Sequence, residues 1–207
     1  MALPMQTITV AICTKDRHEQ LLDTLDSLLE QTRLPDELVI VDASSDDAGS
    51  SLDSRLARFP KATHLRADPG LTRQRNIAID AAAGDLVFFF DDDVLLDERY
   101  LEIMTAVFDD DHDKRLGGAM GQIMSRGFRA KKLYELAADI FLLNDTHGSG
   151  QLKLSGFPCF AHGHMTPFNV ESLSGCCMVF RREVLKKHRF DESLGGYAYM
   201  EDVDFSM

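Results

Sequence analysis

Strand-like and helix-like segments alternate along the first half of the chain, and this alternation restricts the fold more than any other feature. Runs of apolar and β-branched residues predict four buried strands, at 7–12, 37–41, 62–66 and 86–90. Apolar spacing and cap-forming residues predict four helices, at 18–31, 48–58, 70–83 and 97–108. Gly84 is expected to end the third helix as its C′ residue. This order predicts an α/β fold with a mostly parallel, Rossmann-like central sheet and helices on both faces.

The pattern is less regular in the second half of the chain. Strands are expected at 117–124 and 173–180, and helices at 130–143 and 181–188. Residues 144–171 have no period and predict a long loop, and loops of that length inside a domain are usually functional or flexible. One interpretation is a lid over an acceptor, formed by Phe157, Phe160, His162, His164 and Phe168. The alternative is a poorly packed surface loop.

The charge and the cysteines exclude several classes of protein. A net charge of −12 disfavours a general nucleic-acid binder, because such proteins hold phosphates with basic surface. The four cysteines lack zinc-site spacing and are expected to be buried, reduced thiols of a cytoplasmic protein: Cys13, Cys159, Cys176 and Cys177. Neither a signal peptide nor an apolar run of the ~20 residues that span a membrane is found. We therefore expect a soluble chain, and peripheral association with the inner face of a membrane stays open.

Three carboxylates directly follow the fourth expected strand. Asp91, Asp92 and Asp93 come after the apolar run at 86–90. Ligands of open α/β sheets bind at the carboxyl ends of the strands, so these side chains are expected to face a crevice. Paired carboxylates suit Mg²⁺ or Mn²⁺, whose other ligands can be diphosphate oxygens and water. Such a cation would let an acidic protein hold an anionic donor.

Other sites also combine a strand with aspartates, and a second triplet is present in this chain. Asp109 to Asp111 follow a helix instead of a strand and are expected to form a solvated loop. A Walker B element is disfavoured because the chain lacks a G-x-x-x-x-G-K-[ST] loop. A phosphatase with an aspartate nucleophile usually carries its aspartates after the first strand. A nucleotidyltransferase would normally have a glycine-rich loop there, and residues 13–17 contain no glycine.

A second acidic cluster, Glu201, Asp202 and Asp204, follows aromatic and apolar residues near the end of the sequence. A carboxylate at this place can act as general base if it reaches an acceptor hydroxyl. Solvated surface carboxylates are the alternative interpretation.

Polar residues near the other expected strand ends are weaker candidates. Thr14 and Asp42 end the first two strands, so both are expected to face the same crevice as Asp91 to Asp93. Arg73, Arg75 and Asn76 open the third helix, where they can meet a diphosphate or a base. Turn, cap and surface salt-bridge roles are the alternatives.

Five segments of the chain, in order, resemble the inverting family 2 glycosyltransferases of the GT-A fold. They are TVAICTKDR, LVIVDASSDD, GLTRQRNIAIDAAAGDLVFFFDDD, SGCCMVFRREVL and FDESLGGYAYMEDVDFS. The resemblance covers nearly the whole chain and is least clear at 124–171. It implies a single GT-A domain over 1–207, with a donor-binding half at 1–116 and an acceptor-binding half at 117–207.

The resemblance also implies a role for individual residues. Four positions match the donor pocket: Thr14, Asp42, Arg75 and Asn76. Asp92 matches a ribose contact, Asp93 the main metal ligand and Asp91 a supporting residue of the metal site. Asp202, in the pair with Glu201, matches the catalytic base, which takes the proton of the acceptor hydroxyl in a single inverting displacement.

The implied substrates are a nucleoside-diphosphate sugar and a saccharide or lipid-linked saccharide, with Mn²⁺ or Mg²⁺, as in polysaccharide biosynthesis.

The sequence also departs from the family pattern. Residues 42–45 are Asp-Ala-Ser-Ser where many relatives have Asp-Asp-Gly-Ser, which puts one nucleoside contact in doubt. Relatives continue beyond the Glu-Asp pair, so we expect the C-terminal part to be truncated. A truncated or non-catalytic nucleotide-sugar-binding module is therefore the alternative function. Neither the sugar, the base nor the oligomeric state follows from the sequence.

Overall fold

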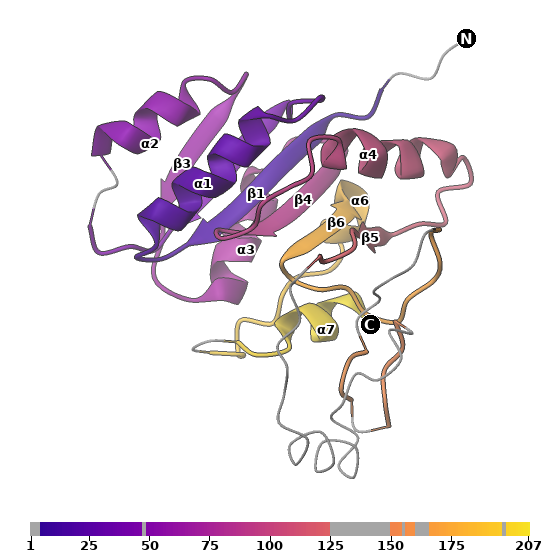
Figure 1. The fold of residues 1–207 in the computed structure, drawn as a ribbon. Coiled ribbons are helices and arrows are strands. Elements are labelled where there is room, and N and C mark those ends of the chain that lie inside the picture. The colour runs from indigo at the N-terminus through magenta and orange to yellow at the C-terminus, as the bar shows by residue number, and fades with distance from the viewer. Residues whose placement is uncertain (1–4, 47–48, 125–149, 155, 160–165, 196–197) are drawn as a thin grey trace, which may run out of the picture.

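A computed structural model describes residues 5–46, 49–124, 150–154, 156–159, 166–195 and 198–207 (Figure 1). Its strands are β1 (Ile8–Thr14), β2 (Glu37–Asp42), β3 (Ala62–Arg66), β4 (Leu86–Asp91), β5 (Gly118–Met120) and β6 (Cys177–Arg181). Its helices are α1 (His18–Leu29), α2 (Gly49–Leu56), α3 (Leu71–Ala81), α4 (Tyr100–Asp110), α6 (Arg182–Leu185) and α7 (Glu201–Ser206).

The strands form one mixed sheet in the order β3-β2-β1-β4-β6-β5. The first four strands are parallel, and β6 runs antiparallel to both β4 and β5. Thr14 pairs with Asp42 across β1 and β2, and Cys13 pairs with Asp91 across β1 and β4. The carboxyl ends of β1, β2 and β4 therefore meet at one edge. This arrangement confirms the predicted α/β fold with a mostly parallel sheet.

Alternating side chains of the strands build a core on each face of the sheet. On one face, Phe88 and its neighbours pack against leucines and aromatic residues of α1, α2 and α4. On the other face, Phe89 lies in a cluster that includes Ala78 and Ile79 of α3 and Leu185 of α6. Figure 1 shows α1, α2 and α4 on one side of the sheet and α3 on the other. Such complete burial explains the continuous apolar run at 86–90.

The predicted segments of the first half correspond to elements of the structure, with bounds that agree to within three residues. The largest difference is at α4, which begins at Tyr100 and not at Asp97. Asp97 instead opens a turn. Its side chain accepts a hydrogen bond from the amide of Arg99 at 3.0 Å, and its backbone carbonyl accepts one from the amide of Tyr100 at 2.9 Å.

The second half differs more from the prediction. Residues 173–176 precede β6 as a loop, and the expected strand at 117–124 is reduced to β5. The short helix α7, which was not predicted, carries the acidic pair Glu201 and Asp202. The expected helix at 130–143 lies outside the described residues. Among those residues, no helix is both long and apolar enough to cross a membrane.

Gly84 does not act as the expected C′ residue of α3. A Cβ atom at Gly84 would lie 2.6 Å from the backbone nitrogen of Thr9 and 2.8 Å from its hydroxyl. The amide of Gly84 donates to that hydroxyl at 2.9 Å. Gly84 is therefore needed because the chain passes close to β1, and not because a helix ends in the left-handed conformation.

The second aspartate triplet is not the solvated loop that was expected. Asp109 and Asp110 are the last residues of α4. Asp111 accepts the buried guanidinium of Arg181 at 3.0 Å and the amide of Leu116 at 2.7 Å. Asp111 fastens the end of α4 to β6, whereas Asp110 is exposed.

Candidate active site

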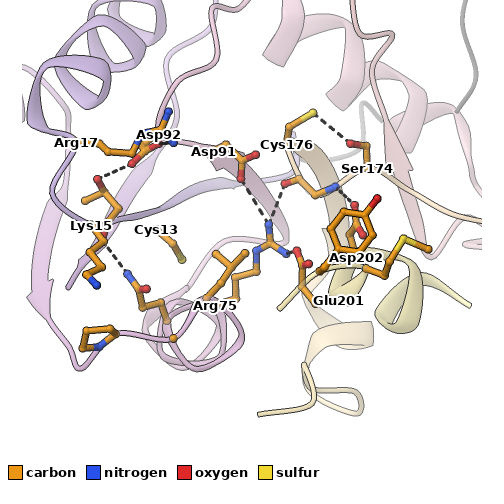
Figure 2. A pocket seen from close by; sticks show the side chains of 18 of the residues that line it. Cys13, Lys15, Arg17, Arg75, Asp91, Asp92, Ser174, Cys176, Glu201 and Asp202 are labelled. Atoms are coloured by element: carbon orange, nitrogen blue, oxygen red, sulfur yellow. Dashed lines mark hydrogen bonds and ion pairs between the residues drawn. The ribbon is translucent and has the colours of Figure 1, made fainter. Parts of the chain in front are cut away.

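A cavity of about 690 Å³ opens at the carboxyl ends of β1 and β4. Figure 2 shows side chains from distant parts of the sequence that line it. Asp91 and Asp92 reach it from the end of β4, and Arg75 reaches it from α3. Glu201 and Asp202 of α7 complete the opposite wall. The fold therefore brings members of both acidic clusters to one cavity, although Asp93 and Asp204 are not among its lining residues.

Asp92 is the most firmly held member of the triplet. One carboxylate oxygen accepts the hydroxyl of Thr14 at 2.7 Å, and the other pairs with Arg17 at 2.8 Å. The backbone carbonyl of Asp92 also accepts the hydroxyl of Thr24 at 2.9 Å. Burial raises the pKa of Asp92, while Thr14 and Arg17 act in the opposite direction. Thr14 and Asp92 thus form a fixed wall between β1 and β4.

Asp91 and Asp93 are more accessible. The Asp91 side chain is 42% exposed, and that of Asp93 is 46% exposed. Asp91 lies 3.6 Å from Arg75, and Asp93 pairs with Arg17 at 2.5 Å. Burial by the surrounding protein raises the pKa of Asp91, and nearby Asp93, Asp92 and Glu201 add to this effect against the charge of Arg75. A cation would relieve this crowding of negative charge.

Arg75 is buried and joins the two acidic clusters. Its guanidinium donates to Glu201 and, at 3.2 Å, to the carbonyl of Gly175. The same group lies 5.2 Å from the ring centroid of Phe190. A Cβ atom at Gly175 would lie 2.8 Å from the guanidinium, so only glycine fits there without a shift. Because its hydrogen bonds are made to protein groups, Arg75 is placed to hold the site together.

Asp202 faces the cavity from the first turn of α7. One carboxylate oxygen accepts the amide of Gly175 at 2.7 Å, and the other accepts the amide of Val203 at 2.8 Å. Asp204, in the same acidic cluster, is exposed and is not among the lining residues. Of the α7 carboxylates, Glu201 and Asp202 line the cavity, and Glu201 is paired with Arg75.

Asp42 does not line the described wall of the cavity, although it ends β2 beside Thr14. Its buried carboxylate accepts hydrogen bonds from the amide of Ser44 at 2.7 Å, from the His64 ring at 3.0 Å and from the Arg66 guanidinium at 2.8 Å. Burial acts to raise the pKa of Asp42, but these hydrogen bonds and the charge of Arg66 lower it overall. Protein donors therefore surround the Asp42 carboxylate, and its donor contact stays a prediction.

Asn76, another predicted donor-binding residue, is not among the residues that line this cavity. Its side chain donates to the carbonyl of Phe190 and to Glu192, both at 2.9 Å, and accepts the amide of Phe190 at 3.0 Å. It holds the segment that leads toward α7. Arg73, which was also predicted to meet a diphosphate or a base, makes exposed ion pairs at 3.6 Å with Asp68 and Glu192.

Aromatic residues line the part of the cavity near Asp202. Phe157 and Tyr199 are among the lining residues. Phe157 belongs to a short hairpin that is closed by the bridge between Leu152 and Pro158. The other described member of the expected lid, Phe168, lines a separate hollow instead. Phe160, His162 and His164 lie outside the described residues.

The sequence analysis missed two residues of the site. Arg17 follows β1 by three positions, and its only signal was a basic residue near a strand end. Gly175 contacts both Arg75 and Asp202, and its signal was the Ser-Gly-Cys-Cys segment before β6. Spacing along the chain did not reveal either contact, since the partners of Gly175 are 100 and 27 positions away.

The cysteines only partly match the expectation. All four are free thiols, but Cys13 and Cys176 are partly exposed and line the cavity. Burial raises the pKa of the Cys13 thiol to about 12. The pKa of Cys176 is lowered by its contact with Cys177, 3.8 Å away, and that contact together with burial raises the pKa of Cys177.

Comparisons with known proteins show which family this chain is similar to. A family model described as glycosyl transferase family 2 matches residues 9–189. Poly(ribitol-phosphate) beta-N-acetylglucosaminyltransferase TarP of Staphylococcus aureus (strain N315) is 34% identical over 106 residues, covering 47% of this chain and 32% of TarP. The chain spans about a third of the length of the curated relatives that it matches.

Solved structures share the fold. S. aureus TarS 1-349 matches with a TM-score of 0.64 and 20% identity, over 97% of this chain and 54% of TarS 1-349. Mannosyltransferase PcManGT from Pyrobaculum calidifontis, in complex with GDP-Man and Mn²⁺, matches with a TM-score of 0.60 and 18% identity. That match covers 91% of this chain and 48% of PcManGT.

Proposed function

The chain belongs to glycosyl transferase family 2, and from this premise we propose that it transfers a sugar from a nucleoside-diphosphate donor to an acceptor hydroxyl, with inversion. The observation that carries the proposal is that Asp91, Asp92 and Asp202 line one cavity at the carboxyl end of the sheet. In this proposal the diphosphate binds on the side of Asp91 and Asp92, and Asp202 is the base on the other side. Residues 1–116 form the donor side, and residues 117–207 contribute the acceptor side.

The proposed cofactor is Mn²⁺ or Mg²⁺, and the donor set fits such an ion. Asp91 and Asp93 each have one carboxylate oxygen without a hydrogen bond or ion pair to the described residues. No cluster of three or more His, Cys, Asp or Glu side chains suited to a metal occurs among those residues. Two carboxylates suffice when phosphates and water complete the shell, as is usual for Mg²⁺. PcManGT, which shares the fold, was solved with GDP-Man and Mn²⁺.

A cation bound there would supply charge stabilisation for the leaving diphosphate. The chain's own residues do the rest. Asp92 and Thr14 shape the wall where the ribose of the donor is expected. Lys15 and Arg17 bring positive charge to the same cavity. TarS has been solved with UDP and with UDP-GlcNAc, which supports a nucleotide-sugar donor for this fold.

Asp202 is the proposed general base. Its carboxylate is held by two backbone amides, and it takes the proton from the acceptor hydroxyl as that oxygen attacks the anomeric carbon. Glu201 and Arg75 are positioning residues, because they hold the loop at Gly175 that orients Asp202. Asp42 supports the donor wall at the end of β2, and Asn76 supports the segment before α7.

The proposed acceptor is a saccharide, either free, lipid-linked or part of a polymer. Phe157 and Tyr199 offer flat apolar surfaces beside Asp202, and sugar rings have apolar faces that can pack on them. TarP is named for transfer to poly(ribitol-phosphate), which is a polymer. The alternative function, a nucleotide-sugar-binding module without catalysis, lacks a role for the oriented carboxylate of Asp202.

Donor turnover by the Asp202→Asn variant tests the proposal. Turnover should fall by about 10²- to 10⁴-fold, the usual contribution of a general base, while donor binding stays unchanged. Asp204→Asn is the matched control, since it makes the same change on the exposed face of α7. Full activity of Asp202→Asn would refute the assignment of Asp202 as the general base. Donor binding without any turnover by the wild-type chain would favour the binding module.

A further inference from the structure

We propose that Arg17 is an internal counter-cation, which neutralises Asp92 and Asp93 before the donor binds and is displaced from Asp93 by the divalent cation. Once displaced, Arg17 pairs with the diphosphate of the donor. This inference rests on the proposed function, because it requires a cation and a nucleoside diphosphate in this cavity. Arg17 would then oppose binding of the metal alone and favour binding of the metal–nucleotide complex.

The guanidinium of Arg17 binds both carboxylates at once. Its Nη1 atom lies 2.8 Å from an oxygen of Asp92, and its Nη2 atom lies 2.5 Å from an oxygen of Asp93. Asp93 raises the pKa of Arg17 further, so the group stays charged. Because Asp92 is also fixed by Thr14, Arg17 and Asp93 are the movable members of this cluster. Their side chains are 45% and 46% exposed.

A metal ion and Arg17 compete for Asp93. Mg²⁺ binds carboxylate oxygens at about 2.0–2.1 Å, and a guanidinium within hydrogen-bond distance of the same carboxylate would face a doubly charged ion. The repulsion between these charges favours departure of the arginine, whose long stem allows it to turn. Thr14 can keep Asp92 in place during this exchange.

The cavity provides a destination for the displaced guanidinium. Arg17 is itself a lining residue of the cavity, as are Lys15 and Asp91. Guanidinium groups bind phosphate oxygens through two parallel hydrogen bonds, so a donor diphosphate is a suitable partner. The arginine thus exchanges one pair of anionic oxygens for another when the donor and its cation arrive together.

Binding of Mn²⁺ alone to the Arg17→Ala chain, followed by the electron paramagnetic resonance signal of free Mn²⁺, is the first test. The variant should bind Mn²⁺ about two- to fivefold more tightly than wild type, since an exposed ion pair no longer has to be broken. Arg55→Ala is the matched control, because Arg55 pairs with Asp26 outside the cavity and the net charge changes equally. Equal or weaker Mn²⁺ binding by Arg17→Ala than by Arg55→Ala would overturn the inference.

Calorimetric titration with UDP and GDP at saturating Mn²⁺ is the second test. Here the substitution is expected to weaken binding, whereas it strengthens the binding of Mn²⁺ alone. Arg17→Ala should bind the nucleotide about tenfold more weakly than Arg55→Ala, the loss typical of a charge-assisted hydrogen bond. Unchanged nucleotide affinity would contradict the move of Arg17 to the diphosphate. If the wild-type chain binds neither Mn²⁺ nor nucleotide, the proposed function itself fails. If it binds both and Arg17→Ala behaves like Arg55→Ala, only the role of Arg17 fails.

Discussion

Asp91, Asp92 and Asp93 follow one another in the sequence, yet their environments differ. Asp92 is buried against Thr14, whereas Asp91 and Asp93 keep nearly half of their side-chain surface exposed. The sequence indicated that the triplet ends a buried strand at the ligand-binding edge. It did not show which aspartate is fixed, because that depends on Thr14 and Arg17, which lie 75 or more positions away.

Removing each aspartate should therefore affect stability differently. Asp92→Ala leaves the Thr14 hydroxyl and one side of Arg17 without a partner, and should lower the free energy of unfolding by about 1–3 kcal/mol. Asp93→Ala should change it by no more than about 0.5 kcal/mol, as for most surface substitutions. Urea unfolding of both variants without nucleotide checks this, and equal losses would contradict the assigned environments.

The buried carboxylate of Asp42 should make stability depend on pH. Its pKa is lower in the folded chain than its ordinary value of 3.8, so the charged form stabilises the fold. That contribution is fully present above the ordinary value and is lost as pH falls through the lowered value. Asp42→Asn should therefore be about 1.5–3 kcal/mol less stable than wild type at pH 7, with a smaller difference below pH 3.8. A difference that is independent of pH would rule out this account.

At the scale of elements, three segments distant in sequence meet at one guanidinium. Arg75 of α3 contacts Glu201 of α7 and the carbonyl of Gly175 before β6. The sequence predicted α3 from its alanine content, but a surface salt bridge was as reasonable for Arg75 as a donor contact. Burial and long-range partners, which spacing does not encode, assign this arginine to the joint between the two halves.

Weakening this joint should affect catalysis more than donor binding. Glu201→Gln removes one charge of a buried pair, which should destabilise the fold by about 3–5 kcal/mol and misplace Asp202. We expect the kcat for transfer to fall at least tenfold with little change in donor KM, because Glu201 holds the base and not the donor. Glu183→Gln, at an exposed site, is the control. A rise in donor KM with an unchanged kcat would instead assign Glu201 to donor binding.

The close approach of Gly84 to β1 gives a prediction about packing between elements. Gly84→Ala would place a methyl group 2.6 Å from the nitrogen of Thr9, so β1 or the turn before β4 must shift. Overpacking of this kind should cost about 1–3 kcal/mol. Gly195→Ala is the control, because a Cβ atom there meets no atom within 4 Å. Thermal unfolding of both variants checks this, and equal midpoints would show that Gly84 is not under packing constraint.

At the scale of the whole molecule, the alternation of segments was enough to predict a mostly parallel sheet. The strand order and the reversed direction of β6 were not predictable, since β6 pairs with β4 across about 90 positions and no local pattern records that choice. The position of Asp91 and Asp92 at the ligand-binding edge of the sheet followed from their place directly after a buried strand. The roles of Asp42 and Asn76 did not, because their partners come from β3 and from the segment before α7.

The acidity of the whole chain, with a net charge of −12, makes the central claim testable in one measurement. The claim is that a divalent cation at Asp91 and Asp93 allows this chain to hold a diphosphate. Calorimetric titration of UDP and GDP into the chain, with Mn²⁺ and with EDTA, tests it directly. We predict binding only with Mn²⁺, lost in Asp93→Ala and retained in Asp110→Ala at the exposed end of α4. Equal nucleotide binding in EDTA, or full binding by Asp93→Ala, would contradict the account.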